Sequence, residues 1–220
     1  VAAHLMLENL DDALADGVQS QEAREKVDAL AEEVDRVEGY IEQALFYARS
    51  ESLDRDYVVR NASLQSIVSS ALRRNARTMI SAHVAPICRG LELEVFADEK
   101  WVEFILGQLI QNSVKYAREE GAQLLFSASR VNVGRADDCV KLVVRDNGCG
   151  VPAADLDRVF DRGFTGENGR SGKRSTGIGL YLVRRLCDKM GLGVVARSER
   201  GEFFEVEITF PTNRMHYFES

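Results

Sequence analysis

The order of three short segments constrains this chain more than any other feature of its sequence. Residues 112–116 (Asn-Ser-Val-Lys-Tyr) interrupt an apolar helical pattern, residues 146–151 (Asp-Asn-Gly-Cys-Gly-Val) follow a strand pattern, and residues 177–180 (Gly-Ile-Gly-Leu) open the last helical pattern. A helix start offers N–H groups to phosphate, and a carboxylate accepts hydrogen bonds from a base. Each segment alone is weak evidence, but together they predict a nucleotide pocket in an α/β fold.

Composition limits the classes of protein to consider. The 220 residues suffice for one domain plus an accessory element. A net charge of −7 argues against a nucleic-acid partner, because a phosphate backbone requires clustered lysine and arginine. The four cysteines form no CxxC pair, so we expect reduced thiols in a cytoplasmic domain.

From the pattern of apolar residues we expect no membrane-spanning run and no signal peptide within residues 1–220. Val1 is not a natural start, however, so we expect a fragment of a longer protein whose membrane segments precede it.

Residues 1–52 are predicted to form a helical hairpin. The first helix covers residues 1–15, a turn follows, and Ser20 can cap the second helix. Apolar residues of the second helix alternate at spacings of three and four: Val27, Leu30, Val34, Val37, Ile41, Ala44 and Ala48. A lone hairpin cannot bury this stripe, which favours a dimeric four-helix bundle. The alternative is a monomeric arm that packs on the same chain.

Residues 53–213 are predicted to form an α/β sandwich, with a mixed, mostly antiparallel sheet and helices on one face, followed by a tail at 214–220. Helices are predicted over 64–72, from Asp98 to about residue 118, and over 176–190, where Gly191 ends the helix. Residues 161–177 are rich in glycine and nearly devoid of apolar side chains, which predicts a mobile loop. The predicted strands are 56–60, 84–88, 91–96, 123–131, 139–145, 193–198 and 203–210.

Three side chains of the long helix point to metal-bound phosphate. Gln108, Asn112 and Lys115 share one helix face. The Asn112 carbonyl can ligate Mg²⁺ without neutralising it, because Mg²⁺ takes few protein ligands and completes its shell with phosphate and water. Lys115 can meet a phosphate. Alternatively, these residues form a solvated helix face. The other side of the helix is formed by Leu106, Leu109, Ile110, Ser113 and Ala117.

The end of the strand over 139–145 is predicted to select the base. Asp146 can accept a hydrogen bond from the exocyclic amine of adenine, whereas guanine presents a carbonyl there. Gly148 and Gly150 allow the backbone to pass close to the base. The alternative is an ordinary turn, for which Asp-Asn-Gly is a common composition.

The start of the last helix is predicted to receive phosphate. Gly177 and Gly179 leave N–H groups exposed at the positive end of the helix. The glycine-rich segment before it has a local excess of two positive charges, because Arg162, Arg170, Lys173 and Arg174 outnumber Asp161 and Glu167. It reads as a lid over the phosphates, or alternatively as a plain surface loop.

These segments resemble the motifs of bacterial sensor histidine kinases, whose adenine-binding fold is shared with gyrase, the mismatch-repair ATPases and related chaperones. Residues 108–116 look like the asparagine box, 146–150 like the first glycine box, 159–166 like the phenylalanine box and 177–180 like the second glycine box. The resemblance covers nearly the whole chain. Residues 98–105 are most similar to the small-loop kinases that work with peptide-exporting transporters in Gram-positive bacteria.

The resemblance implies ATP and Mg²⁺ as cofactors, with Asn112 on Mg²⁺, Asp146 on adenine, and Arg162 or Lys115 near the phosphates. It also implies a second copy of the chain, a response regulator and a membrane transporter as partners. The remaining pocket residues that it implies are Tyr116, Gly148, Gly150, Phe160, Phe164, Lys173, Thr176, Gly177, Gly179 and Leu180.

Two departures from the family pattern shape the predicted function. Gln108 stands where the ATPase cousins carry a water-activating glutamate, and an amide cannot act as a general base. Phosphoryl transfer is therefore favoured over hydrolysis. The phosphoacceptor motif, His-acid-x-x-x-Pro, is missing, and His4 precedes Leu5 rather than an acid. Residues 1–7 resemble those that follow that proline, so we expect the acceptor just ahead of Val1 and no catalytic residue in this chain.

The sequence thus predicts the kinase core of a sensor histidine kinase. The alternatives are an ATP-hydrolysing conformational machine of the same fold and a non-catalytic dimer module. A serine-directed anti-sigma kinase is also related, but it would have no reason to carry the hairpin.

Overall fold

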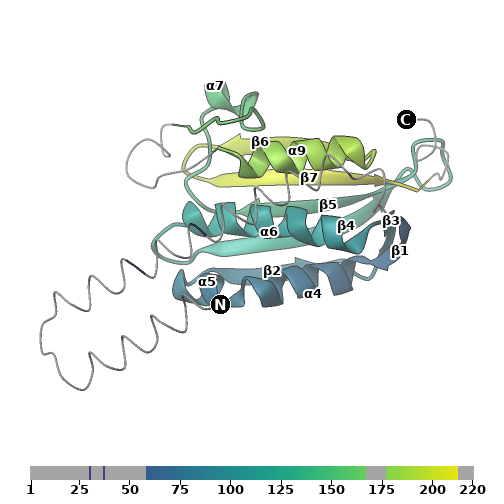
Figure 1. Ribbon diagram of the computed structural model, residues 1–220, viewed down its shortest axis with the longest axis horizontal. Helices are drawn as coiled ribbons and strands as arrows, with labels where there is room; N and C mark the ends of the chain where they lie inside the picture. Colours follow the sequence, from purple (N-terminus) through teal and green to yellow (C-terminus); the bar gives the residue numbers. More distant parts are fainter. Residues whose placement is uncertain (1–29, 31–36, 38–57, 167–176, 213–220) are drawn as a thin grey trace, which may run out of the picture. The chain divides into compact units, whose positions relative to one another are not determined.

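The computed structural model describes Leu30, Val37 and residues 58–166 and 177–212 (Figure 1). The chain divides into two compact units, Val1–Asp54 and Arg55–Ser220. The predicted hairpin and tail lie outside the described residues, except for Leu30 and Val37, which are both helical and exposed.

A five-stranded mixed sheet forms the centre of this unit. Its spatial order is β2 (Ala85–Arg89), β4 (Gln123–Val131), β5 (Cys139–Asp146), β7 (Phe203–Pro211) and β6 (Gly193–Glu199). The β2–β4 pair is parallel, and the other three pairs are antiparallel. The prediction of a mixed, mostly antiparallel sheet is confirmed.

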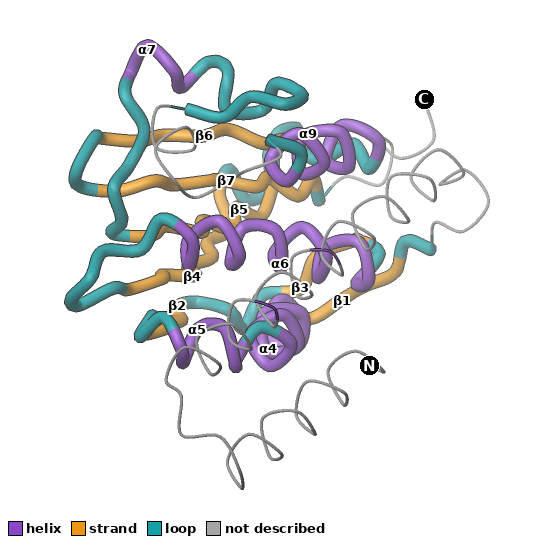
Figure 2. The backbone as a smooth tube through the Cα atoms, turned by 60° about the vertical axis from the view of Figure 1, so that its left-hand side comes forward, coloured by secondary structure: helices purple, strands orange, loops and turns teal. Residues whose placement is uncertain are grey.

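Helices cover one face of the sheet, as Figures 1 and 2 show together. They are α4 (Leu64–Arg74), α6 (Glu99–Lys115) and α9 (Gly179–Lys189), and α6 packs against both of the others. A separate antiparallel pair joins β1 (Arg60–Ser63) to β3 (Glu94–Ala97). Alternate strand residues face the helices, as the two-residue period of a strand requires. The fully buried core includes Leu124, Phe126, Leu142, Ile208 and Phe210 from the sheet, and Ile105, Leu106, Ile110, Leu182 and Leu186 from the helices.

Asp98 begins the long helix α6, as the sequence predicted. Its side chain accepts a hydrogen bond from the Lys100 N–H at 3.0 Å, which satisfies one of the free donors of the first turn. The other carboxyl oxygen accepts from the Val58 N–H at 3.0 Å. Asp98 therefore caps α6 and also connects the backbone at Val58 to the start of this helix.

Several boundaries differ from the prediction. The strand expected at 56–60 is wrong at residues 58 and 59, because β1 begins at Arg60 and continues to Ser63. The strand expected from 91 begins at Glu94. α6 ends at Lys115 rather than near 118, and α9 begins at Gly179 rather than near 176. Two short helices, α5 (Ala76–Ser81) and α7 (Ala153–Leu156), were not predicted. They bury one residue and none, respectively, so neither has an apolar period to detect.

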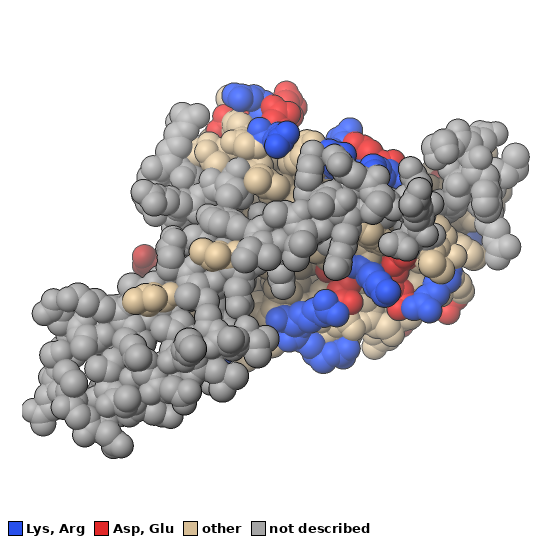
Figure 3. Space-filling view, in the orientation of Figure 1, with Lys and Arg blue, Asp and Glu red and all other residues tan. Residues whose placement is uncertain are grey.

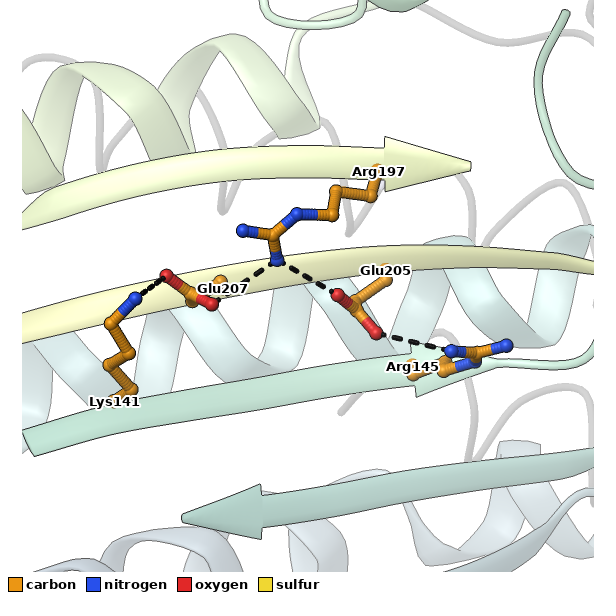
Figure 4. Close-up of polar contacts among 5 residues, drawn as sticks. All are labelled: Lys141, Arg145, Arg197, Glu205 and Glu207. Carbon is orange, nitrogen blue, oxygen red and sulfur yellow. Dashed lines mark hydrogen bonds and ion pairs between the residues drawn. The ribbon is translucent and has the colours of Figure 1, made fainter. Parts of the chain in front are cut away.

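The sheet face away from the helices carries a ladder of alternating charges (Figure 4). The Lys141 ammonium lies 2.7 Å from Glu207 Oε1, and the Arg197 guanidinium lies 3.2 Å from Glu207 Oε2 and 3.1 Å from Glu205 Oε1. Arg145 completes the ladder, 3.4 Å from Glu205 Oε2. Burial raises the pKa of Glu207, but hydrogen bonds from Lys141 and Arg197 outweigh it and leave that pKa below its ordinary value. The ladder links β5, β7 and β6 on the sheet face opposite α4, α6 and α9.

Basic and acidic side chains also mix elsewhere on the surface. On the face shown in Figure 3, the described lysine and arginine side chains lie beside aspartate and glutamate. The negative net charge is therefore not gathered into one acidic field on the described part of that face.

An ion pair between Arg130 and Asp138 closes the β4–β5 hairpin and should make the stability of the domain sensitive to acid. Arg130 donates two hydrogen bonds to Asp138, at 2.9 and 2.7 Å, and the Gly134 N–H donates a third at 3.1 Å. These bonds, the first of them the largest cause, lower the pKa of Asp138 from 3.8 to about 2. A depressed carboxyl pKa contributes stability above the ordinary value, and that stability is lost as pH falls through the folded pKa.

We therefore expect Asp138→Asn to lower the unfolding midpoint at neutral pH and to flatten its further fall between pH about 4 and about 2. Thermal unfolding followed at a series of pH values measures both effects. Asp137→Asn is the matched control, because Asp137 is exposed in the same loop and its described partner is Asn132. An acid profile of Asp138→Asn identical to that of the wild type would contradict this account.

Candidate nucleotide-binding site

Asp146, the last residue of β5, is buried and held from two sides. Its Oδ2 accepts a hydrogen bond from the Ser113 hydroxyl of α6 at 2.9 Å, and its Oδ1 accepts from the Gly148 N–H at 2.9 Å. Burial raises the pKa of Asp146, while hydrogen bonds from Gly148, Ser113 and the Phe204 backbone oppose that rise. The carboxyl group is therefore fixed in one orientation where a strand end meets a helix.

The turn after β5 packs directly on other backbone segments. The Cys149 N–H donates to the Tyr116 carbonyl at 3.2 Å, and the Gly201 N–H donates to the Cys149 carbonyl at 2.8 Å. A β-carbon at Gly148 would clash with the same Tyr116 carbonyl oxygen. One at Gly150, where φ is +59°, would clash with the Glu199 carbonyl. Backbone packing thus requires both glycines, a reason that the sequence did not reveal.

We expect Gly150→Ala to destabilise the domain by about 2–4 kcal/mol, because a left-handed conformation and a backbone clash add together. Urea unfolding measures the effect. Gly121→Ala is the matched control: its φ is +64°, but a β-carbon there would meet no atom within 4 Å. It should cost about 1–2 kcal/mol, the strain alone. Equal losses of unfolding free energy in the two variants would show that the clash with Glu199 does not contribute to the destabilisation.

The amide side chains of α6 face the start of α9. A β-carbon at Gly179 would lie 3.0 Å from Gln108 Oε1 and 3.8 and 3.9 Å from the Asn112 amide atoms. Gln108 is buried, and Asn112 is half-buried. The predicted common face of these two residues is confirmed. Lys115 follows in the last turn, its ammonium 5.6 Å from the centre of the Tyr116 ring.

The two ends of the glycine-rich segment meet in a short stem. The Gly163 N–H donates to the Gly177 carbonyl at 3.0 Å. A β-carbon at Gly177, where φ is +64°, would lie 2.5 Å from the Phe164 carbonyl oxygen, so the two backbone segments that form the stem are in close contact. The predicted lid residues between them, including Lys173 and Thr176, lie outside the described residues.

Two aromatic residues in and just before the stem each lie close to an arginine. The Arg184 guanidinium lies over the Phe160 ring at 5.9 Å, and Arg158 lies over the Phe164 ring at 4.8 Å. Arg162 is exposed between them. Leu180 is half-buried in the first turn of α9.

The structure therefore brings half of the predicted site residues together in pairs: Asp146 with Gly148, Tyr116 with Gly148, Asn112 with Gly179, and Phe164 with Gly177. It adds Ser113, which lies on the side of the helix that was expected to be apolar. A polar residue on a buried helix face is the signal that could have found it, because buried hydroxyls require a partner.

The donor set of this region fits a magnesium ion. Within residues 58–166 and 177–212, no three histidine, cysteine or carboxylate side chains gather into a metal site. The Asn112 amide is a neutral oxygen donor beside the start of α9, a place suited to phosphate. Mg²⁺ commonly uses few protein oxygens and fills its shell with phosphate and water.

Comparison with known proteins defines the class. Residues 97–214 match the family model described as "Histidine kinase-, DNA gyrase B-, and HSP90-like ATPase". The match covers more than half of the chain, and the chain belongs to this family.

Its curated relatives are sensor histidine kinases, so the predicted resemblance is confirmed. The chain is 35% identical over 196 residues to sensor histidine kinase YxdK of Bacillus subtilis, covering 87% of this chain and 58% of the relative. It is 30% identical over 201 residues to sensor histidine kinase GraS of Staphylococcus haemolyticus, covering 88% of this chain and 54% of the relative. The chain spans about half the length of these relatives.

Solved structures show the same fold. Full-length ShkA in complex with AMPPNP superposes with a TM-score of 0.67 at 23% identity, covering 90% of this chain and 40% of that one. The Acinetobacter baumannii histidine kinase AdeS gives a TM-score of 0.64 at 16% identity, covering 96% of both chains. Among the described helices, none combines the length and the apolar character needed to cross a bilayer.

Proposed function

We propose that this chain is the kinase core of a two-component sensor histidine kinase. Residues from about 54 bind Mg·ATP. The γ-phosphoryl group passes to a histidine that lies ahead of Val1, and then to an aspartate of a response regulator. The observation that carries the proposal is the buried Asp146 carboxylate, fixed by Ser113 and Gly148 next to a helix whose amide face meets the start of α9.

Each residue has a defined part in this proposal. Asp146 accepts the adenine amine, and a guanine carbonyl in its place would be repelled. Asn112 holds Mg²⁺, and Lys115 or Arg162 neutralises phosphate charge. The N–H groups that begin α9 receive phosphate oxygens. Positioning and charge neutralisation are the main contributions of a protein to phosphoryl transfer.

A buried amide favours transfer over hydrolysis. Gln108 is 6% exposed on the side of α6 that faces Gly179. An amide cannot take a proton from water at neutral pH, so the ATP-hydrolysing alternative lacks its base at this position. The fixed Asp146 carboxylate counts against a non-catalytic dimer module, because a buried, oriented carboxyl group is costly without a ligand to meet.

The hairpin is proposed to dimerise. Leu30 and Val37 of the predicted apolar stripe are 57% and 47% exposed, which leaves apolar surface for a second copy to cover. The other proposed partners are the response regulator and, by resemblance to the small-loop kinases, a peptide-exporting transporter. The full-length protein is accordingly proposed to sit in the plasma membrane with this part in the cytoplasm.

The proposal is tested by calorimetric titration of the chain with ATP, with Mg²⁺ and with EDTA. We expect Mg²⁺ to strengthen binding, and Asn112→Ala to remove about tenfold of affinity, or 1.4 kcal/mol, only when Mg²⁺ is present. Gln111→Ala is the matched control, because Gln111 is an exposed amide on the same helix. If Asn112→Ala changes affinity equally with Mg²⁺ and with EDTA, its assignment to the metal is wrong.

A further inference from the structure

We propose that Ser113 is a positioning residue for base recognition: its hydroxyl holds the Asp146 carboxylate in the orientation that accepts the exocyclic amine of adenine. This inference rests on the proposed function, because it concerns how the proposed ATP site distinguishes one base from another.

The Ser113 hydroxyl donates its proton to the Asp146 carboxylate. The side chain lies on the buried side of α6 with 5% of its surface exposed, and its Oγ is 2.9 Å from Asp146 Oδ2, across 33 residues of sequence. An ionised carboxylate only accepts hydrogen bonds, so the hydroxyl must be the donor. A serine hydroxyl has a single proton, and here it is committed to Asp146.

The acceptor sites of the carboxylate explain what this bond does for a ligand. A carboxylate offers about four lone-pair sites. The Ser113 hydroxyl occupies one on Oδ2, and the Gly148 N–H occupies one on Oδ1. The sites that remain can be filled only by donors such as an amine. Because one fixed donor holds each oxygen, the carboxyl group cannot rotate freely and its remaining acceptor sites keep their direction.

Loss of the hydroxyl should degrade recognition in two ways. The carboxyl group loses one of the bonds that set its orientation, so the free acceptor site is no longer directed. Burial already raises the pKa of Asp146, and the Ser113 bond counteracts that rise. Without the bond, more of the protein carries a protonated carboxyl group, whose O–H faces the adenine amine as a second donor.

A purely structural role would look different. Ser113 also joins α6 to the end of β5, and a variant could weaken every ligand simply by loosening that contact. A ligand without the exocyclic amine separates the two roles. Purine riboside triphosphate carries the same sugar and phosphates as ATP but has hydrogen in place of the amine, so it gains nothing from a directed carboxylate.

The experiment compares ATP with purine riboside triphosphate, both with Mg²⁺, by calorimetry on the 220-residue chain. We expect Ser113→Ala to lower the affinity for ATP by roughly 3- to 10-fold. A loss of this size lies within the range of interaction energies between residues of one hydrogen-bond network. Binding of purine riboside triphosphate should change by less than about twofold. Ser129→Ala removes an exposed serine hydroxyl outside the site and should alter neither affinity.

Equal losses for both nucleotides, or no loss for ATP, would overturn the inference. If Ser113→Ala lacks a cooperative thermal transition, Ser113→Cys replaces it. A thiol is similar in shape and a weak donor, so the same selective loss of ATP affinity is expected. The two proposals fail differently: a wild-type chain that binds neither nucleotide refutes the ATP site, whereas an unchanged ratio of affinities in a wild type that binds both refutes the role of Ser113.

Discussion

Replacing Asp146 with asparagine is expected to weaken ATP binding by about 10- to 100-fold, the loss of a hydrogen bond to a charged group worth roughly 1.5–3 kcal/mol. Asparagine keeps the shape of the side chain, but it can turn an N–H donor toward the adenine amine. Calorimetric titration measures the change. Asp137→Asn removes the same charge from an exposed loop position and should leave ATP affinity unaltered.

The loss of affinity in Asp146→Asn should not arise from unfolding of the domain. Burial raises the pKa of Asp146 above its ordinary value, so its ionised form costs the unliganded fold stability at neutral pH. Removing the charge is therefore not expected to unfold the domain, and a thermal melt can verify that. Unchanged ATP affinity in a folded Asp146→Asn variant would refute the assignment of this residue to adenine.

The chain is expected to bind ATP without labelling itself. Phosphoryl transfer to histidine requires an imidazole in line with the γ-phosphate and an adjacent acid to orient its proton. None of the three histidines is followed by an acid in the sequence. His83 is exposed in a turn with φ of +54°, and His4 and His216 lie outside the described residues. Incubation with radiolabelled ATP and Mg²⁺ should leave the chain unlabelled.

A chain extended upstream through the missing histidine is the positive control. It should acquire a label that is labile in acid and stable in base, and ATP binding should be verified on both preparations. Labelling of the shorter chain at His4 would show that His4 is the acceptor and that the helix register assigned from the sequence is incorrect.

Sequence patterns predicted the elements that have clear periods and clear ends. β4 occupies 123–131 as expected, because its apolar alternation is bounded by Gly121 and Gly134. The start of α6 followed from the capping side chain of Asp98. The pairing of β2 with β4 in parallel could not be predicted, because it depends on which strands meet in space and not on either strand alone.

The site was predictable in its residue types and less so in its contacts. The common face of Gln108 and Asn112 follows from helical spacing, and the structure confirms it. The hydrogen bond from Ser113 to Asp146 joins residues that are 33 positions apart, so the periodicity of a single helix or strand cannot predict it. The need for glycine at 150 likewise arises from the carbonyl oxygens of a distant hairpin.

The stem formed by Gly163 and Gly177 has a consequence for how this family can vary. A hydrogen bond and close backbone contact join the two ends of this segment, so it is closed at its base by Gly163, Phe164 and Gly177. Adding residues to a closed loop costs little, about 0.6 kcal/mol for each doubling of its length. Insertions and deletions between Phe164 and Gly177 should therefore leave the thermal stability of the domain nearly constant, which allows this segment to diverge while the scaffold around it stays the same.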